Sequence, residues 1–254
     1  MKLVILGSGT SVPHPDRAAA AFWLQTGGGS LLLDMGPDAA HRMAQERLDW
    51  ANLDAIWISH FHLDHIGGLA PFLFGTRGAP QMQTRRKSLT IFGPEGVARI
   101  FDALDQVSNH LLRKQKFPIE VIEVKPRSEF QILPGLMANT FSTPHTTESL
   151  AVRLTEINGT SLVYTSDTGF SEELIDFCKG ASLLLLECSF YRNKPVETHL
   201  DLAEAIELTR ACQPRKLVLT HLYPEWDGID PATEAETLWP GEIIEARDGL
   251  RLEF

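Results

Sequence analysis

The sequence predicts an α/β fold in which two mixed β-sheets pack face to face and helices cover their outer surfaces. Three observations support this prediction. Short runs rich in Val, Ile, Leu and Phe recur along the chain, which is typical of buried strands. Stretches with helical periodicity lie between many of these runs. Several strands come first, helices and strands then alternate, and a similar order returns after about residue 120, which favours a layered sandwich.

Each expected strand is a short apolar run that is bounded by Gly, Pro, Asn or Asp. Glycine-containing turns at 27–29 and 158–159 predict hairpins between their flanking strands. In chain order, the expected strands are Leu3–Leu6, Ala20–Gln25, Ser30–Asp34, Ala55–Ser59, Leu89–Phe92, Ile119–Val124, Glu129–Leu133, Leu136–Phe141, Leu150–Thr155, Ser161–Thr165, Leu183–Glu187, Leu217–Thr220 and Gly249–Glu253.

The expected helices begin where proline or acidic residues favour a first turn. Pro94 followed by Glu95 predicts one helix start, and Ser171 followed by Glu172 and Glu173 predicts another. In chain order, the expected helices are Asp38–Leu48, Gly67–Phe74, Pro94–Val107, Ser171–Cys178, Leu200–Cys212 and Ala232–Leu238.

The composition is that of an ordinary globular protein. The chain has 254 residues, of which 43% are hydrophobic and 22% charged, and its formal net charge is −10. These values exclude disordered, collagenous and mucin-like chains. No repeat or long Pro/Gly-rich linker divides the sequence, so residues 1–254 are expected to form a single domain. The acidic balance argues against broad, charge-driven nucleic-acid binding.

The cysteines and the apolar runs indicate the compartment. Cys178, Cys188 and Cys212 are odd in number and form no C-x-x-C pair, so neither a disulfide framework nor a cysteine-rich zinc site is expected. The first apolar run is shorter than a secretory signal, and no run reaches the roughly 20 residues of a membrane span. We therefore expect a cytoplasmic protein that does not associate with membranes.

The segment His60–His65 reads H-F-H-L-D-H and contains four potential metal ligands in six residues. It follows the apolar run Ala55–Ser59 and precedes Gly67. A rigid strand end can direct such side chains around one cavity. Histidine nitrogens and carboxylate oxygens are the ligands of a catalytic zinc or a similar divalent ion. The segment therefore predicts a metal centre.

An H-x-H-x-D-H motif after a strand resembles the signature of the metallo-β-lactamase superfamily of hydrolases, whose fold is an αββα sandwich. In that pattern a third metal ligand follows a central strand, an acidic residue follows the next hairpin, and a histidine ends a late strand. His145, Asp167 and His221 occupy these places in order. The resemblance covers essentially the whole chain and includes every ligand position.

This resemblance implies two divalent metal ions for each chain. Zinc is expected first, while manganese and iron stay open because the same N and O ligands accept all three. Two metals that share a water can lower its pKa and clamp the attacking and leaving oxygens. The implied ligands are His60, His62 and His145 for one metal, Asp64, His65 and His221 for the second, and Asp167 as the bridge.

The first loop resembles the opening of the ribonuclease Z-like phosphodiesterases within this superfamily. Gly7 and Gly9 follow the first strand, and Pro13 and Arg17 come shortly after them. The glycines permit a tight turn and a close approach of the backbone. The resemblance implies that Arg17 binds substrate, since a guanidinium matches the geometry of phosphate oxygens.

A second segment carries the same likeness. Residues 186–190 read L-E-C-S-F in the place of that branch's H-E-A-T-F, and His199 stands where a later histidine precedes a helix. In the branch, the glutamate and the histidine pair, and the histidine protonates the leaving group. A carboxylate raises the pKa of an imidazole and so prepares it as a general acid. We therefore expect Glu187, His199 and Asp64 to be catalytic.

The sequence also departs from tRNA-processing ribonuclease Z. The stretch from His145 to Asp167 is only a hairpin long, whereas that enzyme inserts a Gly/Pro-rich arm there to grip tRNA. Asp201 stands where a threonine is usual. Basic clusters occur at Arg85–Lys87 and Arg113–Lys116, but such short runs are usually solvated faces. RNA is therefore possible but not favoured as a substrate.

The resulting prediction is a dinuclear metal-dependent hydrolase, namely a phosphodiesterase that cleaves a small or nucleotide-like phosphodiester through a metal-bound hydroxide. Three alternative functions stay open. The chain could be a tRNA 3′-end processing endoribonuclease, a lactonase or thioesterase, or a non-catalytic binding protein with the same fold. Homodimers are common in the resembled family, so a homodimer is also possible here.

Overall fold

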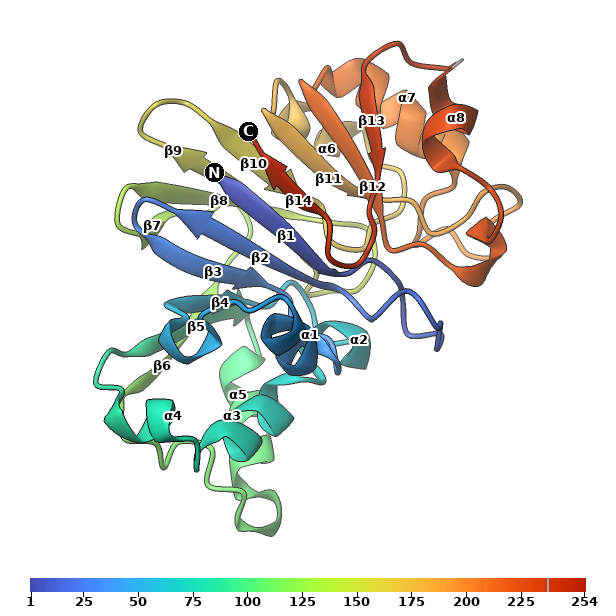
Figure 1. Ribbon diagram of the computed structural model, residues 1–254. Coiled ribbons are helices and arrows are strands. Elements are labelled where there is room, and N and C mark those ends of the chain that lie inside the picture. The colour runs from blue at the N-terminus through green and yellow to red at the C-terminus, as the bar shows by residue number, and fades with distance from the viewer. Residues whose placement is uncertain (237) are drawn as a thin grey trace.

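The computed structural model describes residues 1–236 and 238–254. Two seven-stranded sheets face each other, with α1–α5 on the outer side of one and α6–α8 on the outer side of the other (Figure 1). Both sheets contain parallel and antiparallel neighbours. The predicted αββα sandwich is therefore confirmed.

The first sheet is built from the N-terminal half of the chain and from the last strand. Its strands are, in spatial order, β14 (Arg251–Glu253), β1 (Lys2–Gly7), β2 (Ala21–Thr26), β3 (Gly29–Leu33), β4 (Ala55–Trp57), β5 (Leu89–Pro94) and β6 (Ile119–Val124). The second sheet contains β13 (Glu242–Glu245), β12 (Lys216–Thr220), β11 (Leu183–Glu187), β10 (Ser161–Tyr164), β9 (Leu150–Glu156), β8 (Leu136–Ser142) and β7 (Glu129–Leu133).

The helices divide between the two outer faces. Those on the first sheet are α1 (Ala39–Gln45), α2 (Leu63–Ile66), α3 (Leu69–Thr76), α4 (Pro80–Thr84) and α5 (Val97–Gln106), and those on the second are α6 (Glu172–Cys178), α7 (Leu202–Cys212) and α8 (Pro231–Glu236). None of the helices in the described part of the chain is long and apolar enough to cross a membrane.

Alternating side chains of each strand build separate apolar layers. In β1, Leu3 and Ile5 are fully buried between the two sheets, whereas Val4 and Leu6 pack beneath the helices of the first sheet. This follows from the two-residue period of a strand. Apolar runs without polar alternation therefore mark strands that are covered on both faces.

Several expected boundaries are wrong. Pro94 does not begin a helix, because it ends β5 and pairs with Val124 of β6. Gly96 then turns the chain at φ +104°, a conformation that favours glycine, and α5 begins at Val97. The prediction also missed β13, α2 and α4. The expected helix 232–238 is observed as Pro231–Glu236, and residue 237 lies outside the described residues.

The fold brings several strand ends to one edge of the sandwich. In the first sheet, β3 and β4 are parallel. In the second, β10, β11 and β12 are parallel to one another, and β8 runs the same way because both β8 and β10 are antiparallel to β9. Loops that follow these strands carry all the residues that are expected to bind metal. In open α/β sheets, substrates and cofactors bind beyond the carboxyl ends of the strands.

Candidate metal centre

The segment His60–His65 leaves the end of β4 and enters α2. His62 precedes the first turn of α2 in an extended conformation, and Asp64 and His65 lie within that helix. The helix therefore directs Asp64 and His65 differently from His60 and His62. This local geometry divides one short motif into two groups of ligands.

The first group is completed by two residues from the second sheet. Candidate ligand atoms of His60, His62, His145 and Asp167 all lie within 4.8 Å of one another. The Oδ2 atom of Asp167 is 3.8 Å from Nε2 of His60 and 3.6 Å from Nε2 of His145. His62 Nδ1 and His145 Nε2 are 3.0 Å apart, so both nitrogens point to the same place.

The second group contains Asp64, His65 and His221, and their ligand atoms also lie within 4.8 Å of one another. Asp64 Oδ2 is 3.7 Å from Nε2 of His65 and 3.5 Å from Nε2 of His221. The carboxylate of Asp167 reaches this group too, with Oδ1 3.2 Å from His65 Nε2 and Oδ2 3.4 Å from His221 Nε2. Asp167 thus lies between the two groups.

The donor set fits divalent cations. Among the described residues, His60 Nε2, His65 Nε2, His221 Nε2 and Asp167 Oδ1 are buried and have no hydrogen-bond partner. Buried polar atoms without a partner are rare because each one loses its hydration. Cations coordinated by these atoms would compensate the loss at all four positions. The structure therefore shows candidate metal-binding clusters of His and Asp residues.

Four of the candidate histidines are held in the same way, by Nδ1. This ring nitrogen is near a protein oxygen in each case, so that Nε2 is left to face the centre. Such contacts fix the tautomer and the orientation of metal-binding histidines. The pairs are His60 Nδ1 with Ser59 Oγ (3.1 Å), His65 Nδ1 with Asp34 Oδ2 (2.7 Å), His145 Nδ1 with the Thr198 carbonyl (3.0 Å), and His221 Nδ1 with Ser189 Oγ (3.0 Å).

The electrostatics of the centre favour bound cations. Burial lowers the pKa of His60 to about 2, which keeps its imidazole neutral. Burial opposes ionisation of Asp167, but His221 and His65 outweigh it and hold the pKa of this carboxyl well below its usual range. Burial also works against a charged His65, yet Asp167 and Asp34 raise its pKa well above normal. The carboxylates thus attract positive charge to this point.

Asp34 is a candidate functional residue that the sequence interpretation did not identify. It follows β3, is fully buried, and has a positive φ of 57°. Its carboxylate accepts hydrogen bonds from the Ser59 backbone N–H, the Ser59 hydroxyl and the Tyr164 hydroxyl, besides contacting His65. Asp34 therefore orients a candidate ligand. Its position at the end of an apolar strand run, like the ligands, was the available signal.

Glu187 and His199 form the expected pair beside the centre. His199 Nδ1 lies 2.8 Å from Glu187 Oε1, and one ring nitrogen of His199 lies within 4.8 Å of ligand atoms of Asp167 and His221. Burial would lower the pKa of His199, but the hydrogen bond to Glu187 and its charge raise the pKa above the ordinary value. The imidazole of His199 therefore faces the centre from the side of His221, and Glu187 stabilises its protonated form.

Glu187 is tied into the backbone around it. Its Oε1 accepts from the Thr168 N–H, and its Oε2 accepts from the Leu200 N–H and from the Ser189 hydroxyl. These donors satisfy a carboxylate that is only 1% exposed. The glutamate is therefore fixed in place when it orients His199.

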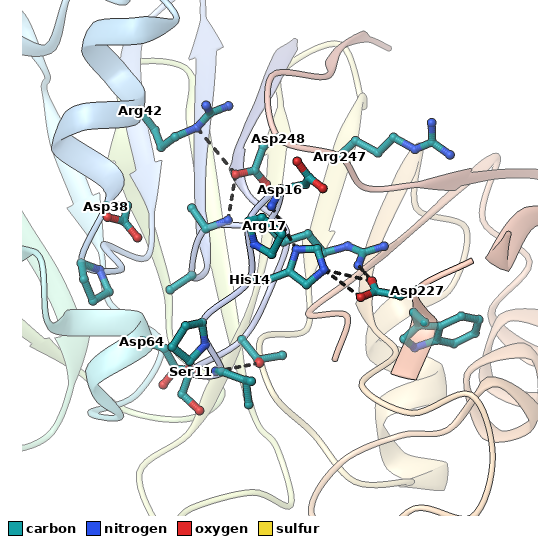
Figure 2. Close-up of a pocket in the computed structure, with 18 of the residues that line it drawn as sticks. Ser11, His14, Asp16, Arg17, Asp38, Arg42, Asp64, Asp227, Arg247 and Asp248 are labelled. Carbon is teal, nitrogen blue, oxygen red and sulfur yellow. Dashed lines mark hydrogen bonds and ion pairs between the residues drawn. The ribbon is translucent and has the colours of Figure 1, made fainter. Parts of the chain in front are cut away.

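A cavity of about 1170 Å³ extends from Asp64 between the first loop, the start of α1 and the loops that follow β12 and β13 (Figure 2). Arg17 lines this cavity together with Asp64, and its guanidinium contacts Asp227 at 2.9 Å and Glu245 at 3.0 Å. His14 Nε2 lies 2.9 Å from the same Asp227 carboxylate. Arg17 thus contacts acidic residues outside the two candidate ligand groups.

A comparison with known families matches residues 1–239 to the family described as Anti-Pycsar protein Apyc1. Among curated proteins, the chain is similar to the probable metallo-hydrolase YhfI of Bacillus subtilis, with 28% identity over 98% of each chain. It is also similar to ribonuclease Z of Archaeoglobus fulgidus, with 24% identity over 99% of this chain and 97% of the relative.

Solved structures give the same result for the fold. The crystal structure of the metallo-β-lactamase fold protein YhfI from Bacillus subtilis has a TM-score of 0.83 and 26% identity, and covers 100% of this chain and 99% of that chain. The short form of human tRNase Z has a TM-score of 0.80 with 20% identity, again over 100% and 99% of the two chains. The expected resemblance to the metallo-β-lactamase superfamily and its ribonuclease Z-like members is therefore confirmed.

Proposed function

This chain belongs to the Anti-Pycsar protein Apyc1 family of metallo-β-lactamase fold proteins, and from that premise we propose that it hydrolyses a small, nucleotide-like phosphodiester. Its relatives include metal-dependent hydrolases, which supports hydrolysis as the reaction. One observation carries the choice of a phosphodiester, namely the buried Glu187–His199 pair beside the two candidate ligand groups.

Two divalent ions, with zinc as the first candidate, would be held by the two groups that share Asp167. Once bound, they would supply positive charge against the phosphate oxygens and lower the pKa of a water. The protein's own part is to fix the ligand nitrogens before any substrate arrives. The contacts at Nδ1 of His60, His65, His145 and His221 serve this purpose.

His199 would act as the general acid. Its Nδ1 is occupied by Glu187, so the imidazolium has one remaining N–H to donate to the leaving oxygen. Glu187 raises the pKa of His199, despite burial, and so favours the protonated form that a general acid requires. A thioester gains less from such a donor, because a thiolate is a weaker base than an alkoxide and leaves without a proton. The pair therefore favours a phosphodiester over a thioester, and the rates on a lactone and on a phosphodiester decide between those two substrates.

The charges around the cavity favour a small substrate over RNA. The cavity lining includes three arginines and seven acidic residues, so an extended polyanion would meet excess negative charge beyond the metal centre.

The basic cluster Arg85–Lys87 offers fewer free positive charges for RNA binding than its sequence suggests. Arg85 is 5% exposed, and its guanidinium donates to the carbonyls of Ala51, Leu53 and Ser88. This arginine stabilises the fold and is not available to a phosphate backbone.

Arg17 retains a proposed role in substrate binding. Its guanidinium has further donors besides the two that contact Asp227 and Glu245. Replacement by lysine would keep the charge and lose the planar fork. An Arg17→Lys variant with an unchanged KM would remove Arg17 from the substrate site.

The test compares rates of the purified protein on bis(p-nitrophenyl) phosphate, a cyclic nucleotide, a lactone, a thioester and a precursor tRNA. We expect turnover of the phosphodiesters. The variants His62→Ala and Asp167→Ala should abolish it, whereas His199→Ala should slow it and leave the metal content unchanged. Undiminished turnover in Asp167→Ala would contradict a dinuclear centre. Faster turnover of the lactone, the thioester or the tRNA would replace the proposed substrate class.

A further inference from the structure

The segment Glu197–His199, which delivers His199 to the centre, is fixed through three successive backbone carbonyls. The Glu197 carbonyl packs so closely on Gly169 that a Cβ there would collide with it. The Thr198 carbonyl lies 3.0 Å from His145 Nδ1. The His199 carbonyl accepts a hydrogen bond from Lys194 Nζ at 3.3 Å. The same short segment therefore orients a candidate metal ligand and carries the proposed acid.

Lys194 joins this segment to the start of α7. Its Nζ contacts Glu204 Oε1 at 2.6 Å and Glu197 Oε2 at 3.1 Å, and its side chain is 9% exposed. Glu204 also takes part in the capping box of α7 with Asp201. The helix N-terminus is thus a firm support for the ammonium group.

The three partners account for all three N–H donors of the ammonium group. No donor is left to reach a substrate. Among the described residues, no other donor contacts the His199 carbonyl. The loop between Phe190 and Leu200 has little regular structure of its own, so its path depends on such contacts.

We propose that Lys194 is a positioning residue that holds His199 in line with the leaving group. This inference rests on the proposed phosphodiesterase function. Proton transfer requires the imidazole to be placed within a few tenths of an ångström, because small misplacements of a catalytic group lower the rate. Glu187 fixes the imidazole from one side, and Lys194 fixes the backbone from which it extends.

The test uses Lys194→Met, Lys194→Arg and the matched control Lys125→Met, which replaces an exposed lysine directly after β6. The kinetic parameters kcat and KM are measured for a series of aryl phosphodiesters. Their leaving groups range from p-nitrophenolate to phenolate, which is the stronger base. Lys194→Met should slow the phenyl substrate by about 10-fold to 100-fold in kcat and the p-nitrophenyl substrate by far less, because only a poor leaving group needs the acid. Lys194→Arg should restore part of the loss.

A second measurement does not depend on activity. The Leu200 amide donates to Glu187 Oε2 next to the segment, so its hydrogen exchange reports the order of this region in the metal-free protein. Lys194→Met should speed exchange in a peptide spanning 195–202, and Lys125→Met should not. Should Lys194→Met fail to fold, Glu204→Gln removes one of the two charged partners of Lys194 and is taken through both measurements.

Three results would overturn the proposal: an unchanged rate, an equal loss for every leaving group, or unchanged exchange at Leu200. Its failure is distinguishable from failure of the proposed function. A wild-type protein that hydrolyses no phosphodiester would contradict the proposed function, and the claim about proton transfer would fall with it. A wild-type protein that is active, with a Lys194→Met variant of normal leaving-group dependence, would contradict only the role of Lys194.

Discussion

Asp34 and His65 are joined by a contact of 2.7 Å between Oδ2 and Nδ1, in a place where both side chains are fully buried. The carboxylate comes from the end of β3 and the imidazole from α2. A candidate metal ligand is thereby supported by a residue that would not touch the metal itself. Such supporting carboxylates usually matter almost as much as the ligands.

We expect Asp34→Asn to weaken metal binding by about 10-fold to 100-fold. The amide cannot accept from all of its present donors, so the metal-free protein should also lose about 1–3 kcal/mol of stability. Chelator competition measures the first effect and chemical denaturation the second. Asp176→Asn, at an exposed position of α6, is the matched control. Equal metal affinity in the Asp34 and Asp176 variants would contradict the assigned role.

The pair Glu187–His199 predicts a specific pH dependence. The acid must be protonated, so activity should fall as the pH rises through the pKa of His199. Glu187 raises that pKa, despite burial, by stabilising the imidazolium. Glu187→Gln removes this effect, so the falling limb of kcat/KM should move to lower pH. The measurement is a pH–rate profile on a substrate with a basic leaving group, and a limb that does not move would exclude His199 as the acid.

Ser189 connects the proposed acid pair to a candidate ligand. Its hydroxyl donates to Glu187 Oε2 at 2.7 Å and lies 3.0 Å from Nδ1 of His221. Ser189→Ala should therefore lower metal affinity and kcat by about 10-fold or more. Ser171→Ala serves as the control, because the Ser171 side chain makes no capping hydrogen bond. Metal titration and steady-state kinetics check both values.

Removal of the metals should destabilise the protein measurably. Ions that bind only the folded state add about 2.7 kcal/mol at a free concentration of 100 Kd. Chelation should lower Tm accordingly, and metal addition should restore it. In Asp167→Ala, the difference in Tm between the loaded and the chelated protein should nearly vanish. A Tm that does not respond to chelation in the wild-type protein would contradict the metal centre.

Gly169 supplies a prediction about packing. Because a Cβ at this position meets the Glu197 carbonyl, Gly169→Ala should cost about 1–3 kcal/mol and displace the segment that carries His199. Gly75→Ala is the control, since no atom lies within 4 Å of the added methyl group and the residue sits in α3. That change should stabilise the protein by up to about 1 kcal/mol. Denaturation curves of the two variants should therefore shift in opposite directions.

The sequence was sufficient for most strands because they are covered on both faces and so read as uninterrupted apolar runs. Leu183–Glu187, whose five residues are all buried, is observed with the predicted bounds. It was not sufficient for β13, where glutamates flank two isoleucines at the edge of the second sheet. An edge strand buries little, so its residues need not be apolar. Pro94 was misread because it is the last residue of β5 and lies beyond the residues that pair with β4, where the strand tolerates a residue without an N–H.

The order of histidines and acidic residues was enough to place the candidate ligands together, because the superfamily pattern fixes which strand end each residue follows. It could not reveal the contacts of Asp34, Ser59 and Ser189, because these contacts join loops that follow different strands. The role of Lys194 could not be predicted for the same reason. Its partners follow from the path of an irregular loop, which no periodicity encodes.

The candidate ligands are divided between the two sheets, with His60 following β4 in one and His221 following β12 in the other. Neither sheet alone offers a complete set for either ion. The full set for either ion therefore forms only where the two sheets are docked. An ion bound at either candidate site would thus act as a cross-link between the two halves of the sandwich, because its coordination bonds would join one sheet to the other.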